Sequence, residues 1–160
     1  MFPAYDIVKA ALGWYMERDN VAYFMGAKGE VLTDARMDDL IRWYPSHFSQ
    51  YDEAQIKKIK NFSRGKIGFD CSGLVSKCVG LSGLSSWTLW DKTRNRTTVK
   101  DCKAGSLLWR PGHIGIDIGY GYSIDIPIEG QTIRIMKNRD TTFEYGGEFI
   151  DADYSMMHNY

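Results

Sequence analysis

Three side chains in this sequence supply a possible nucleophile, base and orienting acid: Cys71, His113 and Asp125. Cys71 stands in a polar, glycine-flanked segment that runs into the apolar pair Leu74-Val75, which predicts a loop leading into a helix. Free backbone N–H groups and the positive end of the helix dipole favour the thiolate, the nucleophilic form of cysteine. We therefore treat Cys71 as a candidate nucleophile, with a buried structural cysteine as the alternative.

His113 and Asp125 fall in two segments with period-two alternation, separated by Gly119-Tyr120-Gly121. If all three of these residues form the loop, Gly115 pairs with Asp125, and His113 becomes a diagonal neighbour of Asp125 on the same face. A two-residue loop would place His113 and Asp125 on opposite faces of the hairpin. A nucleophile–base–orienter arrangement therefore requires an odd-length loop.

The elements that must position these residues follow from hydrophobic periodicity. Apolar residues at helical spacing predict helices over residues 5–18, 34–44 (ended by Pro45), 52–62 and from 71 to about 80–83. Alternation predicts strands over 106–109, 113–118, 122–127 and 131–136, with one more short strand near the C-terminus. Residues 82–98 read as a loop, with or without a helical turn, whose Trp87 and Trp90 either line a groove or anchor the loop to the core. Helices followed by an antiparallel meander indicate an α+β fold.

Composition limits the classes of function. A length of 160 residues fits one domain, 1–160, and a net charge of zero gives no reason to expect binding to nucleic acid. Three cysteines, Cys71, Cys78 and Cys102, do not make a disulfide framework, and the scattered histidines argue against structural zinc. We expect no metal or cofactor, and no apolar run is long enough to span a membrane.

The N-terminal segment lacks the basic and apolar regions of a signal peptide. We expect a chain that stays inside its cell, leaves by lysis, in a phage particle or by a specialised export route, or is a trimmed form.

Several motifs together resemble the NlpC-type cell-wall cysteine peptidases, which have a reduced papain-like fold. The motifs are Asp70-Cys71-Ser72-Gly73-Leu74-Val75, residues 104–109, the strand 113–119 and the aromatic-glycine segment 23–26. The resemblance spans roughly residues 5–125. Residues 27–67 form a predicted helical insertion between the Tyr23 and Cys71 motifs, similar to phage-associated and gut-bacterial members.

The resemblance implies that the cysteine attacks an amide of peptidoglycan stem peptides, commonly the bond between D-γ-glutamate and a diamino acid. It assigns Cys71 as the nucleophile, His113 as the base and Asp125 as the third polar residue. Many family members carry histidine at the third position, so Asp125 is a departure that keeps the orienting role. Ser106 is a second departure, because the family often has aspartate there.

The resemblance also implies a substrate-binding role for three residues. Tyr23 matches a tyrosine that lines the site. Asp70 and Ser72 match positions that help to bind the stem peptide, and the Asp70 carboxylate suits a free N-terminal amine. The Cys71 backbone N–H is a candidate donor to the oxyanion.

We therefore expect a monomeric cysteine peptidase that acts on the cell wall, with a peptidoglycan stem peptide as its partner. One alternative keeps the catalytic site but places it in an amidase, transpeptidase or acyltransferase acting on lipid or protein amides. Others are a non-catalytic module that binds cell-wall peptide, or a toxin delivered into a rival cell. An apolar channel would favour a lipid, whereas polar anchors would favour a peptide.

His47 and His158 lack the glycine-rich strand context of His113, and Cys78 and Cys102 read as structural.

Overall fold

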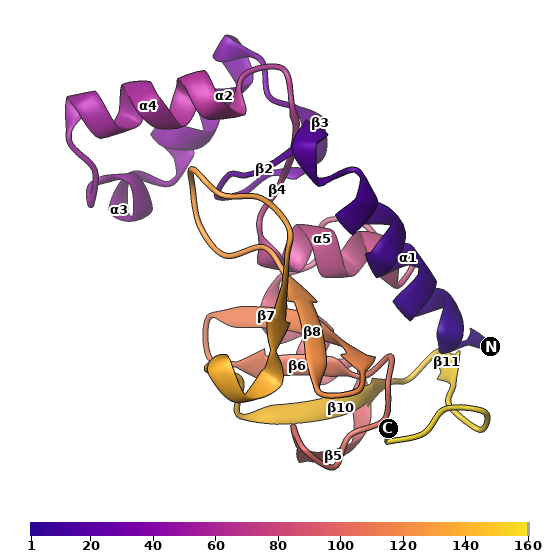
Figure 1. The fold of residues 1–160 in the computed structure, drawn as a ribbon. Coiled ribbons are helices and arrows are strands. Elements are labelled where there is room, and N and C mark those ends of the chain that lie inside the picture. Colours follow the sequence, from indigo (N-terminus) through magenta and orange to yellow (C-terminus); the bar gives the residue numbers. More distant parts are fainter. Residues whose placement is uncertain (160) are drawn as a thin grey trace.

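The largest sheet in the computed structural model, which describes residues 1–159, has six antiparallel strands (Figure 1). Its strands lie in the order β5 (Thr93–Thr98), β10 (Tyr145–Phe149), β6 (Leu107–Arg110), β7 (His113–Gly119), β8 (Tyr122–Asp125) and β9 (Arg134–Lys137). Strands β6 to β9 form the expected meander. Strand β10 pairs with β6 and β5 pairs with β10, so these two strands extend the sheet on the β6 side, out of chain order.

A smaller sheet lies beside the start of the helix α5 (Cys71–Cys78). It has the order β2 (Val21–Tyr23), β4 (Ile67–Phe69) and β3 (Lys28–Val31), with β2 and β4 parallel. Because Tyr23 pairs with Phe69, the sheet brings Tyr23 next to the segment that enters the Cys71 helix. The short strands β1 (Phe2–Pro3) and β11 (Ala152–Asp153) pair in parallel near the N-terminus.

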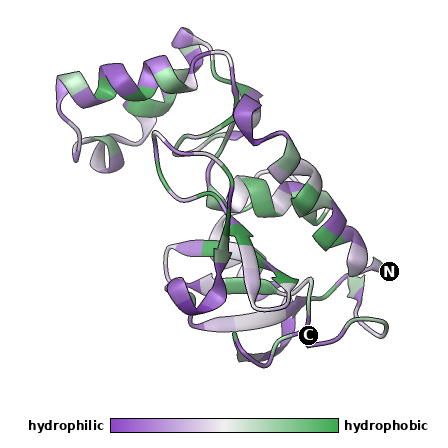
Figure 2. Ribbon diagram, viewed as in Figure 1, coloured by the Kyte–Doolittle hydropathy of each residue, from purple (hydrophilic) through white to green (hydrophobic). Residues whose placement is uncertain are grey.

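Two groups of helices flank the sheets. The helices α1 (Tyr5–Met16), α5 (Cys71–Cys78) and α6 (Ser86–Asp91) contribute to the main hydrophobic core, together with apolar residues of the large sheet. Figure 2 shows hydrophobic residues on α1, α5 and the central strands. None of the helices formed by residues 1–159 is both long and apolar enough to cross a bilayer.

The remaining α-helices form a separate lobe, which we call the helical lobe: α2 (Asp34–Trp43), α3 (Pro45–Phe48) and α4 (Glu53–Ser63). Its core is a second hydrophobic cluster that includes Met37, Leu40, Phe48 and Ile59. Thr33 caps α2 and Asp52 caps α4 through a capping box, as their side-chain chemistry favours. Single-turn 3₁₀ helices occur at η1 (Arg18–Asn20) and η2 (Asn138–Asp140).

Outside the site, one sequence prediction was confirmed and another was incomplete. Helix α2 ends at Trp43, shortly before Pro45, as predicted, and Pro45 also occupies the first position of α3, where its missing N–H removes no hydrogen bond. Residues 82–98 contain a short helix, α6, where the sequence allowed a helical turn, but they also contain the edge strand β5, which was not predicted. The polar sequence of β5, Thr-Arg-Asn-Arg-Thr-Thr, hides the apolar alternation that marks a strand, since much of this edge strand is exposed.

The turn between β7 and β8 differs from the expected three-residue loop, yet the register agrees. Only Tyr120 and Gly121 form the turn, both with positive φ, at 58° and 80°. Ile118 is an extra residue in a β-bulge, because Asp117 pairs with Ser123 and Gly119 with Tyr122. Because the bulge adds one residue to β7, the two-residue turn gives the same strand register as a three-residue loop. His113 and Asp125 therefore lie on the same face of the hairpin, as the hypothesis required.

Candidate active site

Cys71 is the first residue of α5, and Asp70 is its N-cap. The Gly73 backbone N–H donates to Asp70 Oδ1 at 2.7 Å, which fixes the start of the helix. The thiol lies against the backbone N–H groups of Ser72 and Ile114, so the helix start faces the beginning of β7. The sequence-predicted placement of Cys71 at a helix start is therefore what the structure shows.

The helix start does not ionise Cys71 by itself. Burial, followed by the charge of Asp70, raises the pKa of the Cys71 thiol to about 11, although the Ile114 and Ser72 N–H groups and Lys28 act in the opposite direction. The expected thiolate stabilisation is thus present but is outweighed by desolvation. Reactivity at neutral pH consequently needs a base that takes the thiol proton.

His113 begins β7 and is held by an acidic partner. Its Nε2 lies 2.7 Å from Asp125 Oδ2, at the end of β8. Arg134 pairs with Asp125 across β8 and β9, and its Nε and Nη2 donate to the two carboxylate oxygens at 2.7 and 3.1 Å. The structure thus brings together His113 and Asp125 as the sequence predicted, and adds Arg134.

This arrangement fixes which imidazole nitrogen can act as a base. Burial raises the pKa of Asp125, but hydrogen bonds from His113 and Arg134 hold it below the ordinary value, so the carboxylate stays ionised. An ionised Asp125 accepts the Nε2 proton and leaves Nδ1 as the unprotonated nitrogen of a neutral ring. The ring also stacks on Phe143, with centroids 5.1 Å apart and planes 5° from parallel, which restricts its rotation.

Tyr23 lies near Cys71. Burial is the main cause that raises its pKa far above the ordinary value, and the neighbouring Cys71, Glu129 and Asp70 add to it in that order. The phenol therefore stays protonated and can donate a hydrogen bond. Its backbone N–H donates to the Gln131 carbonyl at 3.0 Å, which ties β2 to the loop between β8 and β9.

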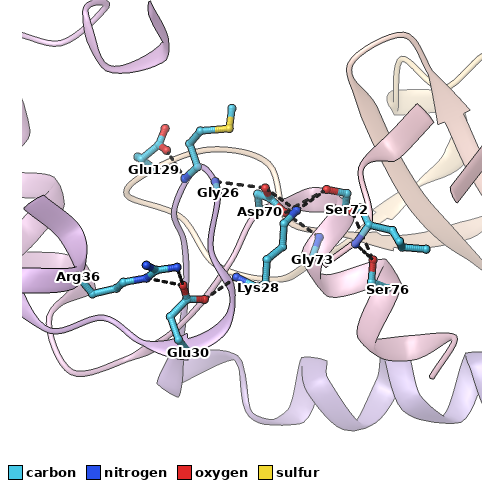
Figure 3. Close-up of polar contacts among 11 residues, drawn as sticks. Gly26, Lys28, Glu30, Arg36, Asp70, Ser72, Gly73, Ser76 and Glu129 are labelled. Carbon is cyan, nitrogen blue, oxygen red and sulfur yellow. Dashed lines mark hydrogen bonds and ion pairs between the residues drawn. The ribbon is translucent and has the colours of Figure 1, made fainter. Parts of the chain in front are cut away.

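Asp70 and Ser72 form a closed polar cluster with Lys28 of β3 (Figure 3). The Lys28 Nζ donates to both oxygens of Asp70 at 2.8 and 2.9 Å and to Ser72 Oγ at 2.9 Å. Ser72 Oγ also donates to Asp70 Oδ1 at 3.1 Å, and the Gly26 N–H to Oδ2 at 3.2 Å. A lysine of the chain itself therefore sits where a substrate amine was expected.

Glu129 forms a second cluster that the sequence analysis missed. It lies in the loop of residues 126–133, which Figure 1 shows rising from the large sheet toward the helical lobe. Glu129 Oε1 lies 2.7 Å from His47 Nε2 and accepts from the Tyr51 hydroxyl at 2.8 Å, and Oε2 accepts from the Met25 N–H at 3.0 Å. His47 is thus bound to Glu129 rather than to Asp125.

The other residues considered from the sequence lie elsewhere. Cys78 ends α5 and is buried, and Cys102 is buried with its thiol 3.1 Å from the Val99 carbonyl. Trp90 is buried and stacks on Trp109 at a centroid distance of 5.2 Å, which anchors α6 to β6. Trp87 packs edge-on against Trp109 and is more than half exposed.

Solved structures share this fold. The NlpC/p60 domain of the peptidoglycan hydrolase SagA is 22% identical with a TM-score of 0.54, and the match covers 91% of this chain and 98% of that domain. The peptidoglycan hydrolase RipB of Mycobacterium tuberculosis is 16% identical with a TM-score of 0.55, over 92% of this chain and 66% of RipB. The P60 domain of the M. avium subspecies paratuberculosis antigen MAP1204 is 14% identical with a TM-score of 0.55, over 92% and 96%. No family model and no curated protein matches the sequence. The chain therefore has the reduced papain-like α+β fold of NlpC/p60 domains.

Proposed function

We propose that this protein is a cysteine peptidase that hydrolyses an amide bond in peptidoglycan stem peptides, the bond between D-γ-glutamate and a diamino acid being the first candidate. The observation that carries the proposal is a cysteine at a helix start, facing a strand whose first residue, His113, is bound to a buried aspartate at 2.7 Å. The fold shared with the NlpC/p60 domain of the peptidoglycan hydrolase SagA and with the peptidoglycan hydrolase RipB supports the substrate class.

The proposed reaction has two steps. Cys71 Sγ attacks the peptide carbonyl carbon while His113 Nδ1 takes the thiol proton, and the Cys71 backbone N–H donates to the developing oxyanion. The C–N bond then breaks, His113 gives the proton to the leaving amine, and a thioester remains on Cys71. A water molecule, deprotonated by His113, attacks the thioester and releases the acid and the thiol. Asp125 keeps the imidazole in the reactive tautomer throughout.

The surroundings of Cys71 favour a peptide over a lipid amide. Tyr23, Asp70 and Ser72 are the proposed substrate-binding residues, and the wall that they form with Lys28 is polar and hydrogen-bonded. An acyl chain would gain nothing from contact with such polar groups, whereas a peptide can place its own polar groups against them, and the protonated Tyr23 hydroxyl can donate a hydrogen bond to it.

The test is digestion of purified peptidoglycan, with the released fragments identified by mass spectrometry, for the unmodified protein and for Cys71→Ala. We expect fragments only from the unmodified protein, and their masses name the bond. Absence of cleavage combined with rapid labelling of Cys71 by a thiol probe would assign the nucleophile to another substrate. Absence of both would favour the non-catalytic binding module.

A further inference from the structure

In the polar cluster beside Cys71, the charged groups of Asp70 and Lys28 already have all the hydrogen-bond partners that they can hold. The Asp70 carboxylate receives five contacts, from the Gly73 and Gly26 N–H groups, the Ser72 hydroxyl and, on each oxygen, from Lys28. A carboxylate offers about four lone-pair directions, so these contacts saturate it.

The Lys28 ammonium is saturated in the same way. Its three N–H groups match three acceptors at 2.8–2.9 Å, which are the two Asp70 oxygens and Ser72 Oγ. The ion pair is therefore neutral as a unit, and it presents neither a free carboxylate to a substrate amine nor a free ammonium donor to a substrate carboxylate.

The backbone of Lys28 is held in place as well, as Figure 3 shows. Glu30 Oε1 accepts the Lys28 backbone N–H at 2.5 Å, and Arg36 Nε of α2 donates to Glu30 Oε2 at 2.7 Å. The space around the cluster is also filled: a Cβ at Gly73 would meet the Ala27 carbonyl at 2.6 Å and Lys28 Cδ at 3.3 Å. A substrate ammonium would have to displace the Lys28 side chain, whose backbone is held by Glu30 of β3 and, through Glu30, by Arg36 of α2.

We propose that Lys28 is a specificity-determining residue: by occupying Asp70 and Ser72 it makes the enzyme select peptides whose amino group at this position is acylated rather than free. This inference rests on the proposed peptidase function. A stem peptide still joined to the glycan through its amino end has such an acylated group, whereas a released peptide carries an ammonium. Binding at this cluster would remove the ammonium from water and place it beside the positive charge of Lys28, which is unfavourable.

The test uses two stem peptides of one sequence, one with a free amino terminus and one N-acetylated. We measure kcat/KM for both with the unmodified protein, Lys28→Met and Lys28→Arg, and Kd for both in the Cys71→Ala background. We expect the unmodified protein and Lys28→Arg to prefer the acetylated peptide by about tenfold, equivalent to roughly 1.4 kcal/mol. Lys28→Met exposes the Asp70 carboxylate and should reverse the preference.

The ratio between the two peptides is the decisive quantity. Lys28 lowers the pKa of Cys71, so its loss can slow cleavage of both peptides equally without changing the ratio. A preference of the unmodified protein for the free amine, or the same ratio in Lys28→Met, would overturn the inference. If neither peptide is cleaved, the proposed function fails, and the Kd ratio in the Cys71→Ala background still decides the role of Lys28.

Discussion

At the scale of single residues, the proton on Cys71 decides whether the site can react at neutral pH. Burial raises the pKa of the thiol to about 11, so the thiol would stay protonated at pH 7 without a base. In the proposed mechanism His113 is that base, and Asp125 and Phe143 hold its ring in place. The reactivity of Cys71 should therefore depend on a neighbour more than on the helix dipole.

His113→Ala tests this dependence through alkylation by iodoacetamide, followed by mass spectrometry of the Cys71 peptide. We expect labelling at pH 7 to fall by at least about 10²-fold, within the range attributed to a general base. The remaining rate should rise about tenfold per pH unit toward pH 11. His158→Ala is the matched control and should leave the rate unchanged. A His113→Ala rate equal to that of the unmodified protein would remove His113 from the mechanism.

Asp125 makes folding stability depend on pH. Burial alone would raise its pKa, but His113 and Arg134 hold the pKa below the ordinary value in the folded state. A group with a depressed folded pKa stabilises the fold above its unfolded pKa, near 3.9, and this stabilisation is lost as the pH falls through the folded pKa. We expect urea midpoints to fall more steeply below about pH 4 for the unmodified protein than for Asp125→Asn. Parallel curves would contradict the assignment.

The residue types that could be predicted were those with a local signature. Cys71, His113 and Asp125 were found because a helix start and two alternating strands are visible in short windows of sequence. Lys28 could not be found this way, because its partner Asp70 is 42 positions away, at the N-cap of α5. Arg134 lies opposite Asp125, but the irregular loop of residues 126–133 hides the register that pairs them.

At the scale of elements, the β7–β8 hairpin holds His113 and Asp125 on one face. The sequence predicted which strand register places these two residues on one face, but it did not predict the β-bulge that produces this register. A two-residue turn with a bulge at Ile118 and a three-residue turn give the same register beyond the turn. Only the backbone conformation of Tyr120 and Gly121 distinguishes the two.

Gly115 allows β7 to lie close to β8 and Phe143. A Cβ at this position would be 2.7 Å from Phe143 Cζ, 2.9 Å from the Ile124 carbonyl and 3.2 Å from Asp125 Cβ. We expect Gly115→Ala to lower the free energy of unfolding by about 1–3 kcal/mol, as overpacking does, and to reduce kcat. Urea unfolding and peptide hydrolysis measure the two effects.

Gly13→Ala is the matched control for Gly115→Ala. Gly13 lies inside α1, and nothing is within 4 Å of a Cβ placed there. This substitution should raise the free energy of unfolding by about 0.5–1 kcal/mol, because alanine loses less entropy than glycine in a helix. Equal effects of the two substitutions would show that the close approach of β8 does not depend on Gly115.

At the scale of the whole molecule, two hydrophobic cores are joined across the candidate active site. The helical lobe has its own cluster, and the large sheet with α1 and α5 has another. Glu129 connects them, because its loop belongs to the sheet while His47 and Tyr51 belong to the helical lobe. The same loop accepts the N–H groups of Tyr23 and Met25, so the position of Tyr23 depends on this connection.

Glu129→Ala should loosen the helical lobe without unfolding the sheet. The Glu129 side chain is fully buried, and its loss leaves the Tyr51 hydroxyl and the Met25 N–H without an acceptor, at a cost of about 1–3 kcal/mol. We expect faster hydrogen exchange in residues 45–51 and 126–133 and unchanged exchange in β6 and β7, together with a higher KM because Tyr23 loses its support. Lys60→Met removes the exposed ion pair with Asp38 in the same lobe and should change neither quantity. Unchanged exchange in Glu129→Ala would mean that the lobes are held together by their apolar contacts alone, whereas equal acceleration in β6 and β7 would mean that they unfold as one unit.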